Sequence, residues 1–129
     1  MTGGLLDTSV VIAIDETGSL ELPDSAGISV ISLGELRAGV ILARDEISRN
    51  LRESRLAFVR HTFDLLPVDE HVAHHFGDAL AWARAKRRSV KASDLLIIAT
   101  AAAGDLVLVT LDNTQAAIAR GLGVNVVNP

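Results

Sequence analysis

The sequence contains no cysteine, and aromatic residues make up only 3% of its 129 residues. The absence of cysteine excludes disulfide bonds and thiolate-based zinc sites, and it agrees with a reducing compartment. The shortage of aromatic side chains argues against base stacking as the main means of holding a nucleic acid. The longest strongly apolar stretch, residues 95–103, is far shorter than the roughly 20 residues that a membrane helix needs. We therefore expect a cytoplasmic protein with no membrane segment.

Basic charge is also scarce, because 12 lysine and arginine residues stand against 16 aspartate and glutamate residues, for a net charge of -4. This balance argues against a protein that binds nucleic acid by bulk electrostatic attraction. An acidic protein can still act on a phosphate group if a bound metal ion reverses the local field. The N-terminus has no basic region, and Asp7 interrupts its first apolar run, so we expect no signal peptide.

Hydrophobic residues make up 49% of the chain and charged residues 22%, which is typical of a globular protein. The length favours one domain over residues 1–129. Short apolar runs predict strands at residues 5–6, 28–31, 63–68, 106–109 and 124–127. Helical patterns lie between them, at residues 9–15, 32–44, 45–61, 69–88, 94–103 and 114–120. This alternation predicts an α/β fold, a three-layer α/β/α arrangement around a central, mostly parallel sheet.

Four acidic residues fall where this fold would bring them together. Asp7 ends the first predicted strand, Glu35 lies one helical turn after the second, and Asp112 follows the strand at 106–109. Asp94 stands in the first turn of an apolar helix. Ligands of an open parallel sheet bind beyond the carboxyl ends of its strands, so we expect these acids to share that edge.

Carboxylates held so closely repel one another and need a cation. Oxygen ligands suit Mg²⁺ or Mn²⁺, and two such ions about 4 Å apart could cleave a phosphodiester bond. Five polar residues beside the acids could orient the carboxylates or water: Thr8, Ser9, Ser93, Thr110 and Asn113.

Each acid also has a purely structural interpretation. Asp7 could cap the helix that follows it, and Glu35 could complete a capping box with Ser32. Asp94 could be a first-turn acid favoured by the helix dipole, and Asp112 could belong to an ordinary turn. The pattern alone leaves the structural and functional interpretations open.

Several segments carry a family resemblance. LLDTSVVIA at residues 5–13 resembles the opening of PIN-domain proteins. ISVISLGELRAG at residues 28–39 resembles their second motif, especially in the VapC-type toxins of bacterial toxin–antitoxin pairs, and LPVD at residues 66–69 recurs in the same toxins. SDLLIIATA at residues 93–101 resembles the third motif, and LVTLD at residues 108–112 the fourth. The ordered set spans essentially the whole chain.

This resemblance implies a metal-dependent endoribonuclease that cleaves a structured RNA, such as transfer or ribosomal RNA. It also implies a homodimer and a cognate antitoxin that occupies or covers the active site. Asp7, Glu35 and Asp94 match the family's core metal-binding positions, and Asp112 matches the fourth acidic position. Thr110 matches a hydroxyl that orients one of the acids.

The chain departs from the family pattern in two places. Thr114, Gln115 and Ala116 stand where many relatives carry another acid and an aromatic residue, and Ser93 replaces an asparagine. The number of metal ions, one or two, therefore stays open. A non-catalytic PIN-like module that only binds RNA or a partner protein is the alternative.

A cluster of cations precedes Asp94: Arg84, Lys86, Arg87, Arg88 and Lys91. We call residues 84–91 the basic segment. It could hold RNA phosphates, contact an acidic antitoxin, or simply form a solvated helix end.

Two further features have structural interpretations. The histidines at positions 71, 74 and 75 have a spacing that can bind a transition metal, but the sequence offers no further ligand, so a solvated helix face is favoured. Asp69 is expected to cap a helix.

Two other enzyme and signalling classes share a small parallel fold with an acid after the first strand. A haloacid-dehalogenase phosphatase needs a second aspartate two residues after Asp7, where this chain has Ser9. A receiver domain needs paired acids at the first strand, which are missing, and Asp69 fits its phosphoacceptor only loosely.

Overall fold

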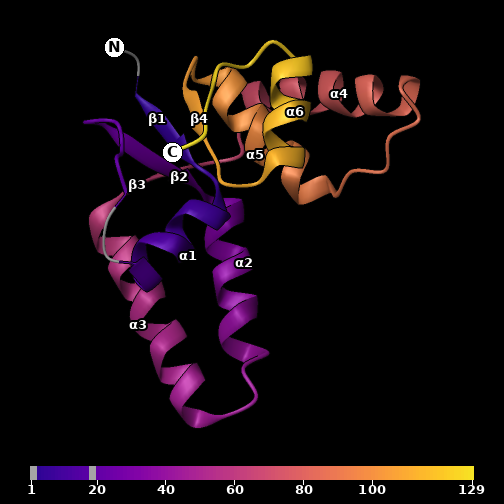
Figure 1. The fold of residues 1–129 in the computed structure, drawn as a ribbon. Helices are drawn as coiled ribbons and strands as arrows, with labels where there is room; N and C mark the ends of the chain where they lie inside the picture. The colour runs from indigo at the N-terminus through magenta and orange to yellow at the C-terminus, as the bar shows by residue number, and fades with distance from the viewer. Residues whose placement is uncertain (1–2, 18–19) are drawn as a thin grey trace.

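The computed structural model describes residues 3–17 and 20–129 and contains a parallel sheet with helices on both sides (Figure 1). Its strands are short: β1 (Gly4–Leu6), β2 (Ala26–Ser29), β3 (Asp64–Leu66), β4 (Val107–Val109) and β5 (Val126–Val127). The helices between them are α1 (Thr8–Thr17), α2 (Val30–Ile41), α3 (Glu46–Thr62), α4 (Glu70–Ala85), α5 (Ala92–Ala103) and α6 (Asn113–Gly121). The strands and helices therefore alternate in the predicted way.

The strand order is β3-β2-β1-β4-β5, and every pairing is parallel. β1 lies at the centre, where Leu5 pairs with Gly27 on one side and Leu108 on the other. Parallel neighbours need crossover connections, and helices supply them. All carboxyl ends of the strands consequently meet at one edge.

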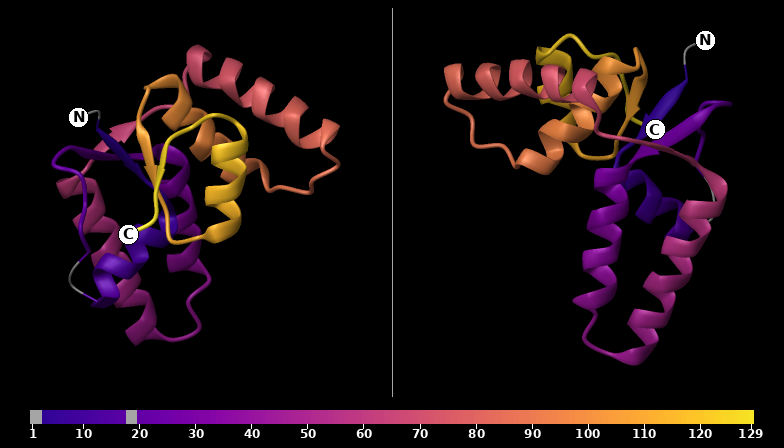
Figure 2. Two further views of the ribbon diagram at one scale, coloured as in Figure 1. Left: turned by 45° about the horizontal axis from the view of Figure 1, so that its top comes forward. Right: turned by 180° about the vertical axis from the view of Figure 1, so that it is seen from behind.

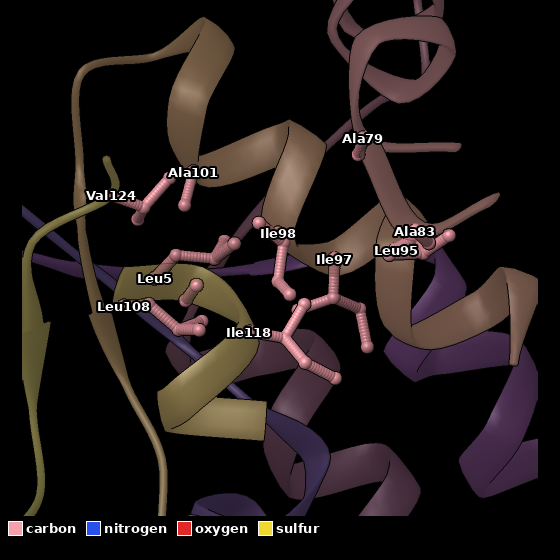
Figure 3. Packing of buried hydrophobic residues seen from close by; sticks show 11 residues of the cluster. Leu5, Ala79, Ala83, Leu95, Ile97, Ile98, Ala101, Leu108, Ile118 and Val124 are labelled. Carbon is pink, nitrogen blue, oxygen red and sulfur yellow. The ribbon is translucent and has the colours of Figure 1, made fainter. Parts of the chain in front are cut away.

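The two leucines of β1 point to opposite faces of the sheet, because side chains alternate along a strand. Leu5 belongs to a core built with α4, α5, β4 and α6, shown in Figure 3. Leu6 belongs to a second core built with α1, β2, α2, α3 and β4. Two cores on the two faces confirm the three-layer arrangement, and Figure 2 shows the two helix groups on either side.

α5 is the most buried helix, as its apolar sequence predicts. Its buried residues are Leu95, Ile97, Ile98, Ala99, Thr100 and Ala101. The helix packs along α4 and beneath β1 and β4. This central position fixes its first turn, which carries Asp94, against the sheet.

The start of α2 differs from the predicted start. Ser29 is the N-cap, and its hydroxyl accepts a hydrogen bond from the Ile31 N–H at 3.0 Å. The predicted capping box between Ser32 and Glu35 is therefore wrong, and the strand ends at Ser29 instead of residue 31. Ser32 is fully buried inside the helix, and Glu35 is bonded to another element.

The end of α4 and the start of α5 also differ from the predicted positions. α4 ends at Ala85, before the predicted end at residue 88, and Arg87 adopts a φ of 55°. A left-handed residue of this kind stops a helix. α5 begins at Ala92 after Lys91, two residues before the predicted start at residue 94. The cap expected at Asp69 is confirmed, because its carboxylate accepts a hydrogen bond from the Val72 N–H. Asp45 caps α3 in the same way and accepts from the Ser48 N–H.

Over residues 3–17 and 20–129, no helix has both the length and the apolar character to cross a membrane.

Candidate active site

Asp7 stands directly after β1 and is only 6% exposed. Its backbone N–H donates to the Val109 carbonyl, which extends the β1–β4 pairing by one residue. Its Oδ2 accepts hydrogen bonds from the hydroxyls of Thr110, at 2.7 Å, and Ser9, at 2.9 Å. A buried carboxylate needs such donors, and here two of them fix its orientation.

Thr110 follows β4 and has no exposed surface. Besides donating to Asp7, its Oγ1 accepts a hydrogen bond from the Asp112 N–H at 3.0 Å. The Ser9 Oγ likewise accepts from the Leu111 N–H at 3.2 Å. These bonds tie the turn between β4 and α6 to the end of β1, so Asp7 and Asp112 occupy neighbouring positions.

Glu35 is half-buried in α2, and its Oε1 accepts a hydrogen bond of 2.8 Å from the Thr8 hydroxyl. The Thr8 Oγ1 also lies 2.9 Å from the Ser32 Oγ. Thr8 immediately follows Asp7, so the contact joins the end of β1 to helix α2. The structure thus places Thr8, Ser9 and Thr110 against the predicted acids.

Asp94 is half-buried in the first turn of α5. Burial raises the pKa of its carboxyl group, and the negative charges of Asp7, Glu35 and Asp112 raise that pKa further. Lys91 opposes them and lowers it. The negative charges of Asp7, Glu35 and Asp112 all act on Asp94, so each of these three acids lies within electrostatic range of it.

Asp112 is exposed and is the N-cap of α6. Its Oδ1 accepts hydrogen bonds from the N–H groups of Thr114, at 2.9 Å, and Gln115, at 3.1 Å. Asp112 therefore has a structural role, which is to cap a helix and not to form the ordinary turn that the sequence suggested. Its position beside the other acids is compatible with a second role through its other oxygen.

Two of the predicted orienting residues contact no acid in the part of the chain that the structure describes. The Asn113 Oδ1 accepts a hydrogen bond from the Asn128 side chain, at 3.0 Å, and so faces the end of the chain. Ser93 is half-buried beside Asp94 without a side-chain hydrogen bond to it in the described residues.

The carboxylates stand near each other without converging on one point. Among the described residues, no three histidine, aspartate or glutamate side chains are arranged closely enough to share a metal ion as they stand. One oxygen each of Asp7, Glu35 and Asp112 is directed to a hydroxyl or a backbone N–H. The donor set of carboxylates and hydroxyls nevertheless suits a hard cation such as Mg²⁺ or Mn²⁺.

Gln115 is a buried residue whose role the sequence did not reveal. It is 3% exposed in α6, and its Nε2 donates a hydrogen bond of 3.0 Å to the Asp94 carbonyl. Its Oε1 is buried and has no partner among the described residues. One sequence feature could have indicated this role: a polar amide stands immediately before the apolar residues Ala116, Ile118 and Ala119. A polar group buried among such residues is expected to form a hydrogen bond.

The basic segment lies at the end of α4 and in its connection to α5. All five cations are exposed, and the Arg88 guanidinium lies 5.7 Å from the centre of the Trp82 ring. Lys91 is the N-cap of α5 and lowers the pKa of Asp94, so the segment reaches the acidic edge at this end.

The histidines of α4 lie apart from this edge. The rings of His71 and His75 meet edge to face, with centroids 4.9 Å apart, and His71 and His74 are exposed. Over the described residues they join no group of three potential ligands, which favours the solvated-face interpretation.

Comparison with known proteins identifies the family. The PIN-domain model matches residues 4–121. Ribonuclease VapC8 of Mycobacterium tuberculosis is 45% identical over 101 residues, which cover 76% of this chain and 89% of the relative. Ribonuclease VapC5 of the same species is 33% identical over 129 residues, which cover 96% of this chain and 93% of the relative.

Solved structures agree with the sequence matches. A structure of VapBC-5 from Mycobacterium tuberculosis, a member of the VapBC family of toxin–antitoxin systems, has a TM-score of 0.86 and 33% identity and covers all of both chains. FitAcB from Neisseria gonorrhoeae has a TM-score of 0.76 and 28% identity, covering 98% of this chain and 97% of the other. The chain therefore belongs to the PIN-domain family and, within it, to the VapC ribonucleases of the VapBC toxin–antitoxin systems.

Proposed function

We propose that this chain is a metal-dependent endoribonuclease that hydrolyses RNA phosphodiester bonds as the toxin of a toxin–antitoxin pair. The supporting observation is the electrostatic coupling of Asp94 to Asp7, Glu35 and Asp112 at one edge of the sheet. Three acids that repel the half-buried Asp94 carboxylate are a costly arrangement in a protein that only folds.

Asp7 and Asp94 are the proposed ligands of Mg²⁺ or Mn²⁺, and Glu35 and Asp112 complete the negative site. A cation there would relieve the repulsion that raises the pKa of Asp94. When bound, such an ion neutralises charge on the phosphate and lowers the pKa of a coordinated water.

The surrounding side chains hold the acids in place for that chemistry. Thr110 and Ser9 both donate to the Oδ2 of Asp7 and so fix the orientation of this carboxylate. Thr8 likewise donates to the Oε1 of Glu35, which is proposed to accept a proton from the attacking water through its Oε2. Gln115 fixes the backbone that carries Asp94. Oriented acceptors of this kind cost no reorganisation during the reaction.

The proposed partners are a structured RNA, such as transfer or ribosomal RNA, a cognate antitoxin and a second copy of the chain, all in the cytoplasm. Solved relatives include a member of the VapBC family of toxin–antitoxin systems and a toxin–antitoxin complex. On this chain, α2 and α3 form a hairpin that extends away from the sheet (Figure 1). It carries five exposed apolar residues, here called the apolar arm: Ile41, Leu42, Ile47, Leu51 and Phe58. A projecting apolar surface of this kind favours protein partners.

Asp7→Asn and Asp94→Asn each test the nuclease proposal. With Mg²⁺ or Mn²⁺, the wild type should cleave total RNA, both variants should lose cleavage while keeping a native circular dichroism spectrum, and EDTA should stop the wild type reversibly. Asp64→Asn is the matched control, because Asp64 is exposed at the opposite end of the sheet. Full cleavage by both variants would refute the assignment.

A non-catalytic PIN-like module is the second candidate, and the lack of three converging ligands among the described residues favours it. Expression in a bacterium separates the two. Growth arrest that persists in the Asp7→Asn variant, with no RNA cut by the wild type in either metal, would support the binding module. Arrest that needs Asp7 and is relieved by the co-expressed antitoxin would support the toxin nuclease.

A further inference from the structure

A groove of about 440 Å³ runs between the basic segment and α6. One wall is formed by Arg88, Ser89 and Val90, and the other by residues of α6: Asn113, Thr114, Ala117 and Ile118. Pockets for small ligands have volumes of about 300–1,000 Å³, so this groove has room for one nucleotide.

Both walls lead directly to the acidic edge. Asn113 and Thr114 follow Asp112, whose Oδ1 accepts the Thr114 N–H. On the other side, the chain runs from Val90 through Lys91 into the first turn of α5, which carries Asp94. A ligand that occupied the groove would therefore end beside two of the four acids.

The lining combines charge with an apolar surface. Arg88 is exposed and stacks near the Trp82 ring, which limits the positions that its guanidinium can take. Ser89, Asn113 and Thr114 add hydroxyl and amide groups, whereas Val90, Ala117 and Ile118 form an apolar part. A nucleotide has the same division, with an anionic phosphate, polar sugar and base edges, and an apolar base face.

On the basis of the proposed nuclease function, we propose that this groove is a subsite for the nucleotide next to the cleaved phosphodiester of single-stranded RNA. Arg88 contacts a phosphate, and the base lies against Val90 and Ala117. RNA is the favoured occupant because the chain carries a net charge of -4, yet five of its 12 cations gather in this segment. The surface that favours a protein partner, the apolar arm, lies elsewhere on the molecule.

Binding of a fluorescein-labelled 12-nucleotide single-stranded RNA of mixed sequence tests the subsite in the cleavage-inactive Asp7→Asn background. Arg88→Ala should weaken binding about tenfold and make the slope of log K against log salt concentration shallower by about 0.7, the value for one phosphate contact. Ala117→Leu narrows the groove and should weaken binding without changing the salt dependence. Arg60→Ala, at an exposed position of α3, is the matched control and should bind like its parent.

Kinetics with otherwise wild-type protein separate the subsite from the nuclease function. Arg88→Ala and Ala117→Leu should raise KM more than they lower kcat. If the wild type cleaves RNA but both variants keep its KM and affinity, the subsite is wrong and the nuclease proposal stands. Loss of antitoxin binding with unchanged RNA affinity would assign the groove to protein and overturn the proposal, as would failure of the Asp7→Asn protein to bind the labelled RNA.

Discussion

Replacing Thr110 with valine tests how the chain holds Asp7. Valine has nearly the same shape but removes a fully buried hydroxyl that donates to the Asp7 carboxylate at 2.7 Å and accepts from the Asp112 N–H at 3.0 Å. A hydrogen bond to a charged group is worth about 1.5–3 kcal/mol, and the Asp112 N–H also loses its acceptor. We expect Thr110→Val to lower the free energy of unfolding by about 2–3 kcal/mol. For a chain of this size that corresponds to a melting temperature lower by roughly 8 °C.

Urea unfolding followed by tryptophan fluorescence provides the measurement, because Trp82 is the single tryptophan and packs against the first core. RNA cleavage should also fall, by about tenfold to a hundredfold, the usual effect of losing a group that orients a metal ligand.

Thr100→Val is the matched control. Thr100 is 3% exposed, but its hydroxyl donates to the Leu96 carbonyl within its own helix, without contacting an acid. A neutral bond of this kind is worth about 1 kcal/mol, and cleavage should not change. Equal destabilisation by the two variants, or wild-type cleavage by Thr110→Val, would refute the role assigned to the Thr110 hydroxyl.

Three further changes test other parts of the site and the fold. Because burial and neighbouring acids raise the pKa of Asp94 above its ordinary value of 3.8, the folded chain binds that proton more tightly than the unfolded chain, and ionisation costs stability as the pH rises through the raised pKa. Asp94→Asn should therefore be more stable than the wild type at pH 7 in EDTA, and the difference should disappear once the pH falls well below 3.8; urea midpoints that show no such dependence on pH would contradict this. Gln115→Leu removes the donor to the Asp94 carbonyl while keeping similar volume, so Mn²⁺ affinity measured by calorimetry without RNA should fall several-fold, and unchanged affinity would exclude a positioning role. Asp15→Ala breaks the ion pair with Arg55, 3.0 Å, and should cost less than about 1 kcal/mol with normal cleavage, since the pair is partly exposed; a loss of several kcal/mol would be unexpected.

The fold could be predicted because its signals are local and agree with one another. The alternation of short apolar runs with helical patterns predicts the parallel sheet, and the continuous apolar sequence of residues 95–101 predicts the central position of α5. The start of α2 could not be fixed in the same way. Ser29 and Ser32 are both good caps by residue type, and the choice depends on Glu35 bonding to Thr8, 27 residues earlier in the chain.

For the candidate site, the sequence predicts which edge of the sheet carries the acids. Strand ends and a helix start place the four acids together, whereas the choice of hydrogen-bond donor for each acid depends on side-chain packing. The sequence placed Thr110 among the residues that could orient an acid, but its pairing with Asp7, 103 positions away, depends on the fold. Asn113, adjacent to Asp112 in sequence, turns toward Asn128, because neighbours at a helix start point in different directions.

The two outermost strands limit the ways in which copies of this chain can associate. β3 has three residues and β5 has two, so each border of the sheet offers few unpaired backbone groups to another chain. Joining two sheets edge to edge would gain little, and short borders of this kind also discourage fibre growth. A stable homodimer of this chain must therefore be assembled from the outer surfaces of its helices.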